Sequence, residues 1–234
     1  MSRVLVPVAV LENEAVPLGL MNLLGTMDVT VLGYHVLPEQ TPPDQARLQY
    51  EERANAALAD IAEEFRDAGG SADYRLVFTA DRQKTVDRVA DEVGARAYAI
   101  SGATGAVDRI LVSLSGDVAA DRILAFVTEL VGDRAIDVTL LRVAGDDGAV
   151  SMEAAAERLD AAGIAATTRI AEGAAPLEAL LDAVPDHDAI VMGEQAPSLQ
   201  SFLFGEVTER VAAESVGPVL VVRRPRSKPE SESE

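Results

Sequence analysis

The sequence predicts an α/β protein made of two doubly wound parallel-sheet units in tandem, with the first unit truncated. Short apolar runs alternate with segments of helical periodicity along the chain. Strands that are apolar throughout are typical of parallel sheets covered by helices on both faces. The alternation restarts near residue 107, where residues 108–117 resemble residues 2–8, which indicates a repeat of about half the chain.

The first half alternates strands with helices of unequal length. Pro17 lies in the first turn of the first helix, where a missing N–H is tolerated. In the second helix, apolar residues from Tyr50 to Ala68 step by three and four, which gives one buried stripe. Gly69 and Gly70 end that helix. Strands are predicted over 4–11, 28–36, 73–79 and 97–101, and helices over 15–27, 43–68 and 81–93.

The second half repeats this alternation and adds one helix and one strand. The predicted units are 1–106, which lacks that last helix and strand, and 107–225; residues 226–234 form a tail rich in Ser, Glu and Pro, expected to be disordered. A single nine-stranded domain is the alternative. Strands are predicted over 108–117, 136–143, 164–170, 188–193 and 218–223, and helices over 118–131, 153–161, 176–184 and 204–215.

The composition excludes several classes of function. Acidic residues number 39 against 20 basic residues, a net charge of −19, which disfavours nucleic acids and anionic membranes as partners. With few lysines, this balance favours a halophilic protein, although an ordinary acidic bacterial protein has similar features. Cysteines are absent and only two histidines occur, so thiolate and multi-histidine metal sites are not expected. The first residues predict neither a signal peptide nor a membrane span, so a cytoplasmic protein without membrane insertion is expected.

The end of the chain carries the most specific motif. A strand ending Val191-Met192-Gly193 is followed by Phe204-Gly205-Glu206-Val207 and by Gly217-Pro218 before an apolar strand. This sequence resembles the C-terminal signature of the universal stress protein (UspA) family, and the chain looks like a tandem haloarchaeal member. The resemblance implies a Rossmann-like fold of the adenine nucleotide alpha hydrolase type. Because the family commonly dimerises through its fifth strand, it implies that Pro218 to Arg223 is an edge able to pair with a second copy.

The resemblance also allows a test for nucleotide binding. ATP-binding members have Gly, two residues, Gly, nine residues, and then Gly followed by Ser or Thr. Here Gly193 matches, Ala196 replaces the second glycine, Gly205 arrives one residue early, and Glu206 follows it. A carboxylate at a helix N-terminus repels phosphate. ATP or AMP is therefore a doubtful ligand and no cofactor is certain.

A crevice at the carboxyl ends of the strands is still expected, because open α/β sheets bind ligands there. The family's Asp at the end of the first strand is replaced by Ala9 in the first half and Ser115 in the second. The predicted lining, for a nucleotide or another small ligand, is Ser115, Val143, Gly193, Gly205, Glu206 and Val207.

Other polar residues favour structural roles. His35 at a strand end is expected to be structural, and His187 could form a weak metal site with Asp186 or Asp188, although a solvated turn is favoured. The cluster of Arg82, Lys84 and Arg88 is expected to be a solvated helix face. No residue is predicted to be catalytic, since no nucleophile elbow is present.

Three functions are consistent with these features. The favoured one is a stress-response or regulatory protein that binds a protein or a small ligand and is not an enzyme. The second is an adenine-nucleotide sensor with weak ATPase activity. The third, by analogy with domains fused to amino-acid permeases, is a regulatory partner of a membrane transporter.

Overall fold

The fold is a single, mostly parallel β-sheet flanked by helices. The computed structural model describes residues 1–12, 14–37, 43–100, 102, 105–114, 119–144, 151–173, 176–194 and 217–224. In this part of the chain, nine strands form one sheet in the order β3-β2-β1-β4-β9-β8-β5-β6-β7. The strands are β1 (Arg3–Ala9), β2 (Asp28–Val36), β3 (Ser71–Thr79), β4 (Ala97–Ile100), β5 (Arg109–Ser113), β6 (Asp137–Val143), β7 (Ala166–Ala171), β8 (Ala189–Gly193) and β9 (Val219–Val222).

The helices cover both faces of the sheet, as the continuous apolar strands predict. One apolar core packs against α1, α2, α4 and α5, and a second core on the other face packs against α3 and α6. None of the helices described is long and apolar enough to cross a bilayer. Their bounds are α1 (Leu18–Leu23), α2 (Pro43–Asp67), α3 (Arg82–Val93), α4 (Ala120–Val131), α5 (Met152–Asp160) and α6 (Pro176–Ala183).

Local sequence explains both ends of α3. Asp81 caps α3, because its side chain accepts a hydrogen bond from the Lys84 amide, and Gly94 ends that helix in the left-handed conformation. The helix predicted over 15–27 is shorter in the structure. Pro17 is extended and precedes the first turn, so the helix begins at Leu18 and ends at Leu23. The helix predicted over 204–215 lies outside the described residues.

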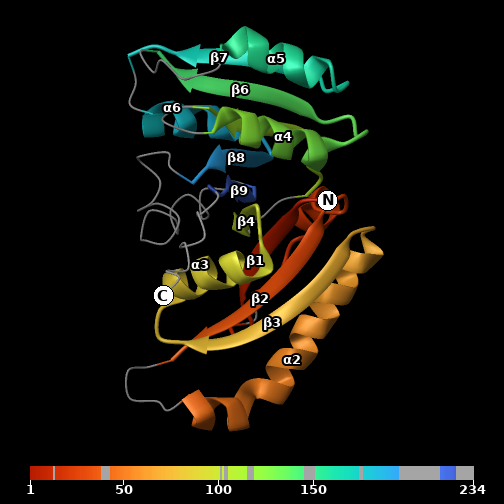
Figure 1. Cartoon of the computed structure of the whole chain (residues 1–234), viewed down its shortest axis with the longest axis vertical. Helices are drawn as coiled ribbons and strands as arrows, with labels where there is room; N and C mark the ends of the chain where they lie inside the picture. Colours follow the sequence, from red (N-terminus) through yellow and green to blue (C-terminus); the bar gives the residue numbers. More distant parts are fainter. Residues whose placement is uncertain are drawn as a thin grey trace, which may run out of the picture.

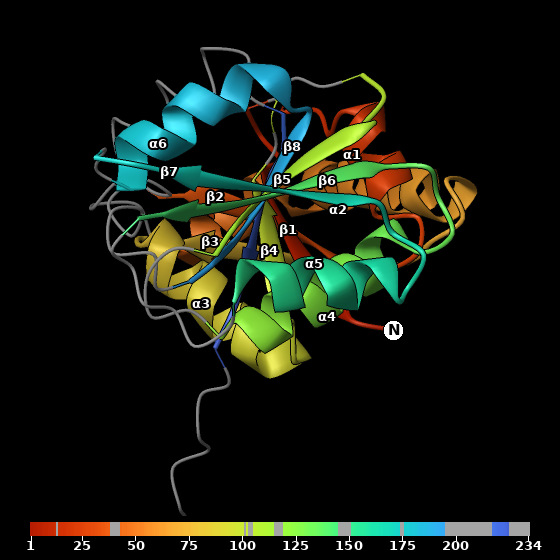
Figure 2. The ribbon, with the colours of Figure 1, turned by 90° about the horizontal axis from the view of Figure 1, so that it is seen from above.

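The strand order repeats on the two sides of the sheet. The first half contributes β3-β2-β1-β4, and the second contributes β7-β6-β5-β8 followed by β9. Figure 1 shows this series from β3 at the bottom to β7 at the top. Seen from above in Figure 2, β6 and β7 cross over β1 and β4, as the twist of a long sheet requires. The α/β fold is confirmed, while the division into units at residue 107 stays a prediction.

The position of β9 corrects the prediction of a free edge at Pro218 to Arg223. This strand lies in the interior of the sheet, parallel to β8 on one side and antiparallel to β4 on the other. Both of its edges therefore have partners within the chain, and it cannot pair with a second copy without displacing one of them. Its continuous apolar sequence reflects burial between two strands.

Candidate functional site

Two of the predicted crevice residues end strands on either side of β5. Val143 is the last residue of β6 and Gly193 is the last residue of β8, and both are buried. Since β6 and β8 are parallel to β5, both residues lie at the same edge of the sheet. The other predicted lining residues, Ser115, Gly205, Glu206 and Val207, lie outside the described residues.

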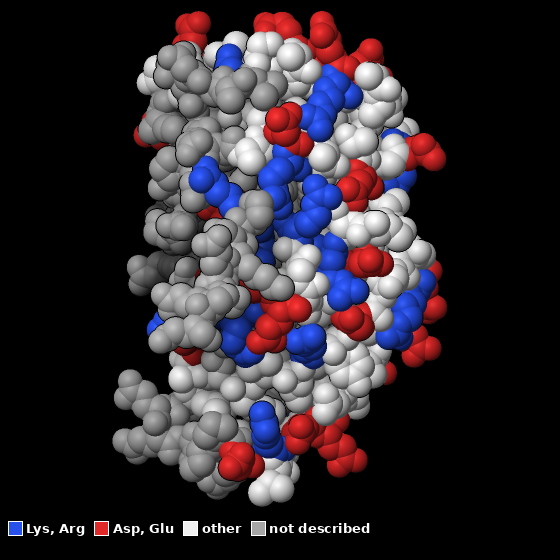
Figure 3. All heavy atoms as spheres, in the orientation of Figure 1, with Lys and Arg blue, Asp and Glu red and all other residues white. Residues whose placement is uncertain are grey.

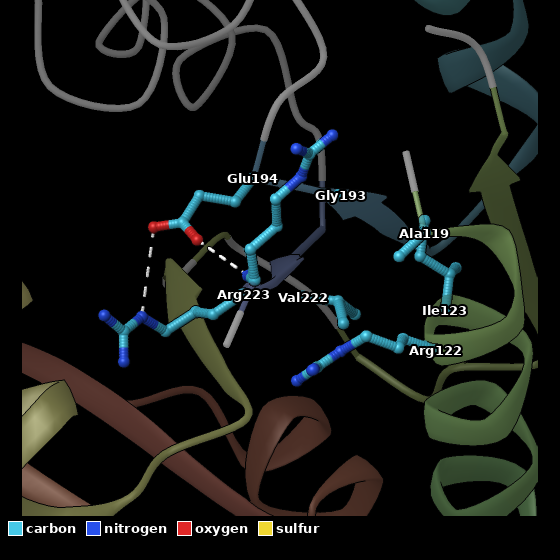
Figure 4. Close-up of a pocket in the computed structure, with 8 residues that line it drawn as sticks. Ala119, Arg122, Ile123, Gly193, Glu194, Val222 and Arg223 are labelled. Carbon is cyan, nitrogen blue, oxygen red and sulfur yellow. Dashed lines mark hydrogen bonds and ion pairs between the residues drawn. The ribbon is translucent and has the colours of Figure 1, made fainter. Parts of the chain in front are cut away.

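A recess lies beside Gly193, between the ends of β8 and β9 and the first turn of α4. Figure 4 shows Arg122 extending from α4 beneath Val222, while Arg223 turns toward Glu194. The recess is lined by Ala119, Arg122, Ile123, Gly193, Glu194, Val222, Arg223 and Arg224. Three arginines thus line the recess in a chain with a net charge of −19.

Carboxylates of the chain already hold part of this positive charge. Arg223, whose side chain is 4% exposed, donates from Nη2 to Asp91 Oδ1 over 2.7 Å. Its Nε lies 3.9 Å from Glu194 Oε1. The other oxygen of Glu194 accepts a hydrogen bond of 2.8 Å from the backbone N–H of Arg224. Glu194 therefore ties together the ends of β8 and β9.

Arg122 differs from its neighbours in this respect. Among the described residues it forms no ion pair, and its buried Nε has no hydrogen-bond partner. Burial lowers the pKa of the Arg122 guanidinium and the positive charge of Arg96 lowers it further, while the negative charge of Glu194 acts in the opposite direction. Arg96 itself donates to Glu129 Oε1 over 2.9 Å and to Ser2 Oγ over 2.6 Å. In Figure 3, Lys and Arg side chains gather along the middle of this face, over α3, β4, β9 and α4.

The matching edge of the first half carries a carboxylate. The backbone N–H of Ala9, at the end of β1, donates a hydrogen bond of 2.6 Å to Glu14 Oε2. Tyr34 lies on the neighbouring strand β2, and the guanidinium of Arg82, at the start of α3, lies over its ring, 4.8 Å from the ring centroid. Burial raises the pKa of Tyr34 to about 12, against the opposing effect of Arg82. This edge is therefore filled by side chains of the chain itself.

The arginine and lysine cluster of α3 is partly as predicted. Lys84 and Arg88 are exposed and pair with Asp81 at 3.2 Å and Glu92 at 2.6 Å, as expected of a solvated face. Arg82 departs from the prediction, because it is half-buried against Tyr34.

The two histidines have structural surroundings. His35 contacts the rings of Tyr50 and Phe78, with centroids 5.9 and 6.2 Å away. The contacts of His187 favour a structural role over the disfavoured metal site. Its Nδ1 lies 2.7 Å from Ala183 O and its Nε2 lies 2.8 Å from Thr139 Oγ1, so both nitrogens are engaged. The described residues contain no group of side chains able to hold a metal ion.

The sequence did not predict the roles of Glu14, Arg122, Glu194 or Arg223. Glu194 and Arg223 each directly follow the last apolar residues of a buried strand, and such a position is a usable signal for a strand-end polar group. Arg122 carries no comparable signal, since it reads as an ordinary polar residue of an amphipathic helix.

Comparisons with known proteins agree with this fold and with the motif near the C-terminal end. Residues 145–223 match the model of the universal stress protein family. The universal stress protein match covers a large part of the second half, which bears out the resemblance seen there in the sequence. The haloarchaeal tandem type stays a prediction. No protein of curated function matches the chain in sequence.

Solved structures of universal stress proteins are similar to this chain. One from Archaeoglobus fulgidus DSM 4304 has a TM-score of 0.67 and 20% identity, covering 97% of each chain, and this likeness establishes the fold. Another from Archaeoglobus fulgidus covers 49% of this chain and 92% of that one, with 20% identity and a TM-score of 0.35. A family member from Burkholderia pseudomallei covers 51% and 97%, with 24% identity and a TM-score of 0.34.

Proposed function

We propose that this chain is a universal stress protein-like regulatory protein that acts by binding a protein or a small ligand, without the ATP-binding mode of the family. The family match over residues 145–223 and the shared fold support the first part of this proposal. The chemistry of the strand ends supports the second part.

The hydrogen bond between the Ala9 amide and Glu14 Oε2 carries the proposal. In a parallel α/β sheet, anionic ligands bind where the strands end, because backbone N–H groups there have no partner in the sheet. At the end of β1 that N–H is taken by a carboxylate over 2.6 Å. A phosphate at this point would have to displace Glu14 and would meet its negative charge.

The second half supports the same conclusion from its sequence. Ala196 stands where the binding motif has a glycine, the residue whose missing Cβ lets a phosphate approach the backbone in that motif. Glu206 stands where the motif has Ser or Thr at the start of a helix. Neither half therefore combines the donors and the charge that a triphosphate needs.

Calorimetric titration with ATP, AMP and adenosine in molar KCl tests the proposal, beside mass spectrometry of any copurified ligand. We expect no submillimolar binding of ATP. Submillimolar ATP binding would contradict the proposal and favour a nucleotide sensor, and an ATPase assay would then decide whether the bound ATP is hydrolysed.

A protein partner is tested by capture from a high-salt lysate followed by titration with the purified candidate. Saturable binding of a soluble protein would support a scaffold role. Saturable binding of a permease would favour a partner of a transporter. Failure of every candidate, together with failure of every small ligand, would contradict a function based on binding.

A further inference from the structure

At the recess beside Gly193, one arginine has no carboxylate partner among the described residues. Arg96 has Glu129 as its partner, and Arg223 has Asp91 and Glu194. Glu194 uses its second oxygen on the backbone of Arg224. In the part of the chain that the structure describes, Arg122 forms no ion pair, its Nε is buried without a partner, and the nearby charge of Glu194 only partly offsets its own.

A buried guanidinium nitrogen without a partner is unfavourable. Removing a donor from water without replacing its hydrogen bond has a cost, and this cost is larger for a charged group. The neighbouring charge of Arg96 adds repulsion. An anion beside Arg122 would supply an acceptor and would offset both effects.

The size of the recess restricts what can enter. The volume open to a water-sized sphere is about 10 Å³, which is room for a single water molecule or one monatomic ion. Water would satisfy the donor but not the charge. An adenine ring or a sugar is far too large for this volume.

We propose that a small inorganic anion of the size of chloride binds beside the Arg122 guanidinium, between the first turn of α4 and the ends of β8 and β9. The anion neutralises the unpaired charge of Arg122. It stabilises the contact of α4 with the two central strands. This site does not depend on the proposed function, because it needs no nucleotide and no partner protein.

Thermal unfolding of the full chain tests the proposal. Potassium is kept at a fixed molar concentration while gluconate, which is too large for the recess, is replaced stepwise by chloride. Since bound anion stabilises the folded state, each tenfold rise above the dissociation constant should raise Tm by about 3–6 °C for a protein of this size. A parallel series with phosphate, which is too large for the recess, should show no Arg122-dependent effect.

Arg122→Gln is the test variant and Arg88→Gln is its matched control. Arg88 also lies on a helix and the change removes the same charge, but Arg88 is exposed and pairs with Glu92 away from the recess. We expect the anion-dependent rise in Tm to disappear in Arg122→Gln and to persist in Arg88→Gln. The chloride-35 NMR signal should broaden in the presence of the unmodified chain or of Arg88→Gln, and this broadening should be lost with Arg122→Gln.

The outcomes separate cleanly. An Arg122-dependent effect of chloride supports the proposal, and an Arg122-dependent effect of phosphate, which is too large for the recess, would overturn it. Equal dependence on both anions in all three proteins would overturn the proposal, as would no dependence in the unmodified chain. If Arg122→Gln does not fold, Arg122→Lys keeps the charge but lacks Nε, and it should bind the anion more weakly.

Discussion

Arg223 donates a hydrogen bond of 2.7 Å to Asp91 and so fastens the end of β9 to α3, across the seam where β9 meets β4. The two residues lie far apart in the sequence. A second bond, from the Arg223 amide to Arg96 O over 2.8 Å, extends the same seam. The two halves of the chain are therefore joined by polar contacts of a buried arginine as well as by strand pairing.

Replacing Asp91 with Ala should lower the free energy of unfolding by about 1–3 kcal/mol, since the buried Arg223 guanidinium loses a charged acceptor. Urea unfolding in molar KCl measures this. Glu92→Ala is the matched control, because Glu92 is about as exposed as Asp91 but, among the described residues, pairs with the exposed Arg75 and Arg88. Its effect should stay below about 1 kcal/mol. Equal effects of the two changes would show that burial of Arg223 is unimportant.

Replacing Gly33 with Ala should destabilise the protein by about 1–3 kcal/mol through overpacking. A Cβ at this position of β2 would lie 2.5 Å from Leu58 Cδ1 of α2, and Leu58 is fully buried. In a Leu58→Ala background the same change should cost little, which a double-mutant cycle measures. Gly105→Ala is the control, since nothing lies within 4 Å of its Cβ position. A full cost of Gly33→Ala in the Leu58→Ala background would refute the contact.

Glu129 should contribute stability that is lost on acidification. Burial by itself raises the pKa of Glu129, but hydrogen bonds from Ser2 and the charge of Arg96 outweigh it, so the pKa lies below its usual value. A carboxyl with a lowered folded-state pKa stabilises the fold above its unfolded pKa, and this contribution disappears as pH falls through the folded value.

The urea midpoint of Glu129→Gln should therefore fall less steeply with decreasing pH, below about pH 5, than that of the unmodified chain. Glu63→Gln, an exposed change within α2, serves as the control and should follow the unmodified chain. Parallel curves for Glu129→Gln and the unmodified chain would contradict the prediction.

A cysteine pair at Ala99 and Leu220 should form a disulfide within one chain. The two residues are partners in the antiparallel pairing of β4 and β9. The hydrogen bond from the Arg223 N–H to Arg96 O makes these two residues a hydrogen-bonded pair. Hydrogen-bonded and non-hydrogen-bonded pairs alternate along an antiparallel ladder, so Ala99 and Leu220 form a non-hydrogen-bonded pair. Such pairs have Cα atoms about 4.5 Å apart, within disulfide range.

The natural chain has no cysteine, so the product is unambiguous. Non-reducing electrophoresis and mass spectrometry should show a cross-linked monomer. A disulfide-linked dimer would mean that β9 pairs with a second copy, and either single-cysteine variant alone should give no cross-link within the chain.

The local features of the fold were predictable from the sequence. Continuous apolar runs identified interior strands such as β1, β5 and β8 to within a few residues, because burial on both faces leaves no alternation, whereas the edge strands β3 and β7 are largely exposed. Pro17 marked the start of the first helix, although its length was overestimated, since the segment after Leu23 turns instead of continuing. Of the predicted crevice, Val143 and Gly193 do end strands at one edge of the sheet, while their role in lining a ligand site stays a prediction.

The sequence by itself determined the class of fold, the order of strands and helices, and the family resemblance of its last third. Only the tertiary structure decided that β9 pairs with β4 and that Arg122 differs from the arginines around it. An apolar strand can have the same sequence at the edge of a sheet and in its interior. The sequence also does not distinguish a parallel neighbour from an antiparallel one. Contacts such as Arg223 with Asp91 join residues that have no local signal in common, so they exist only once the whole sheet has formed.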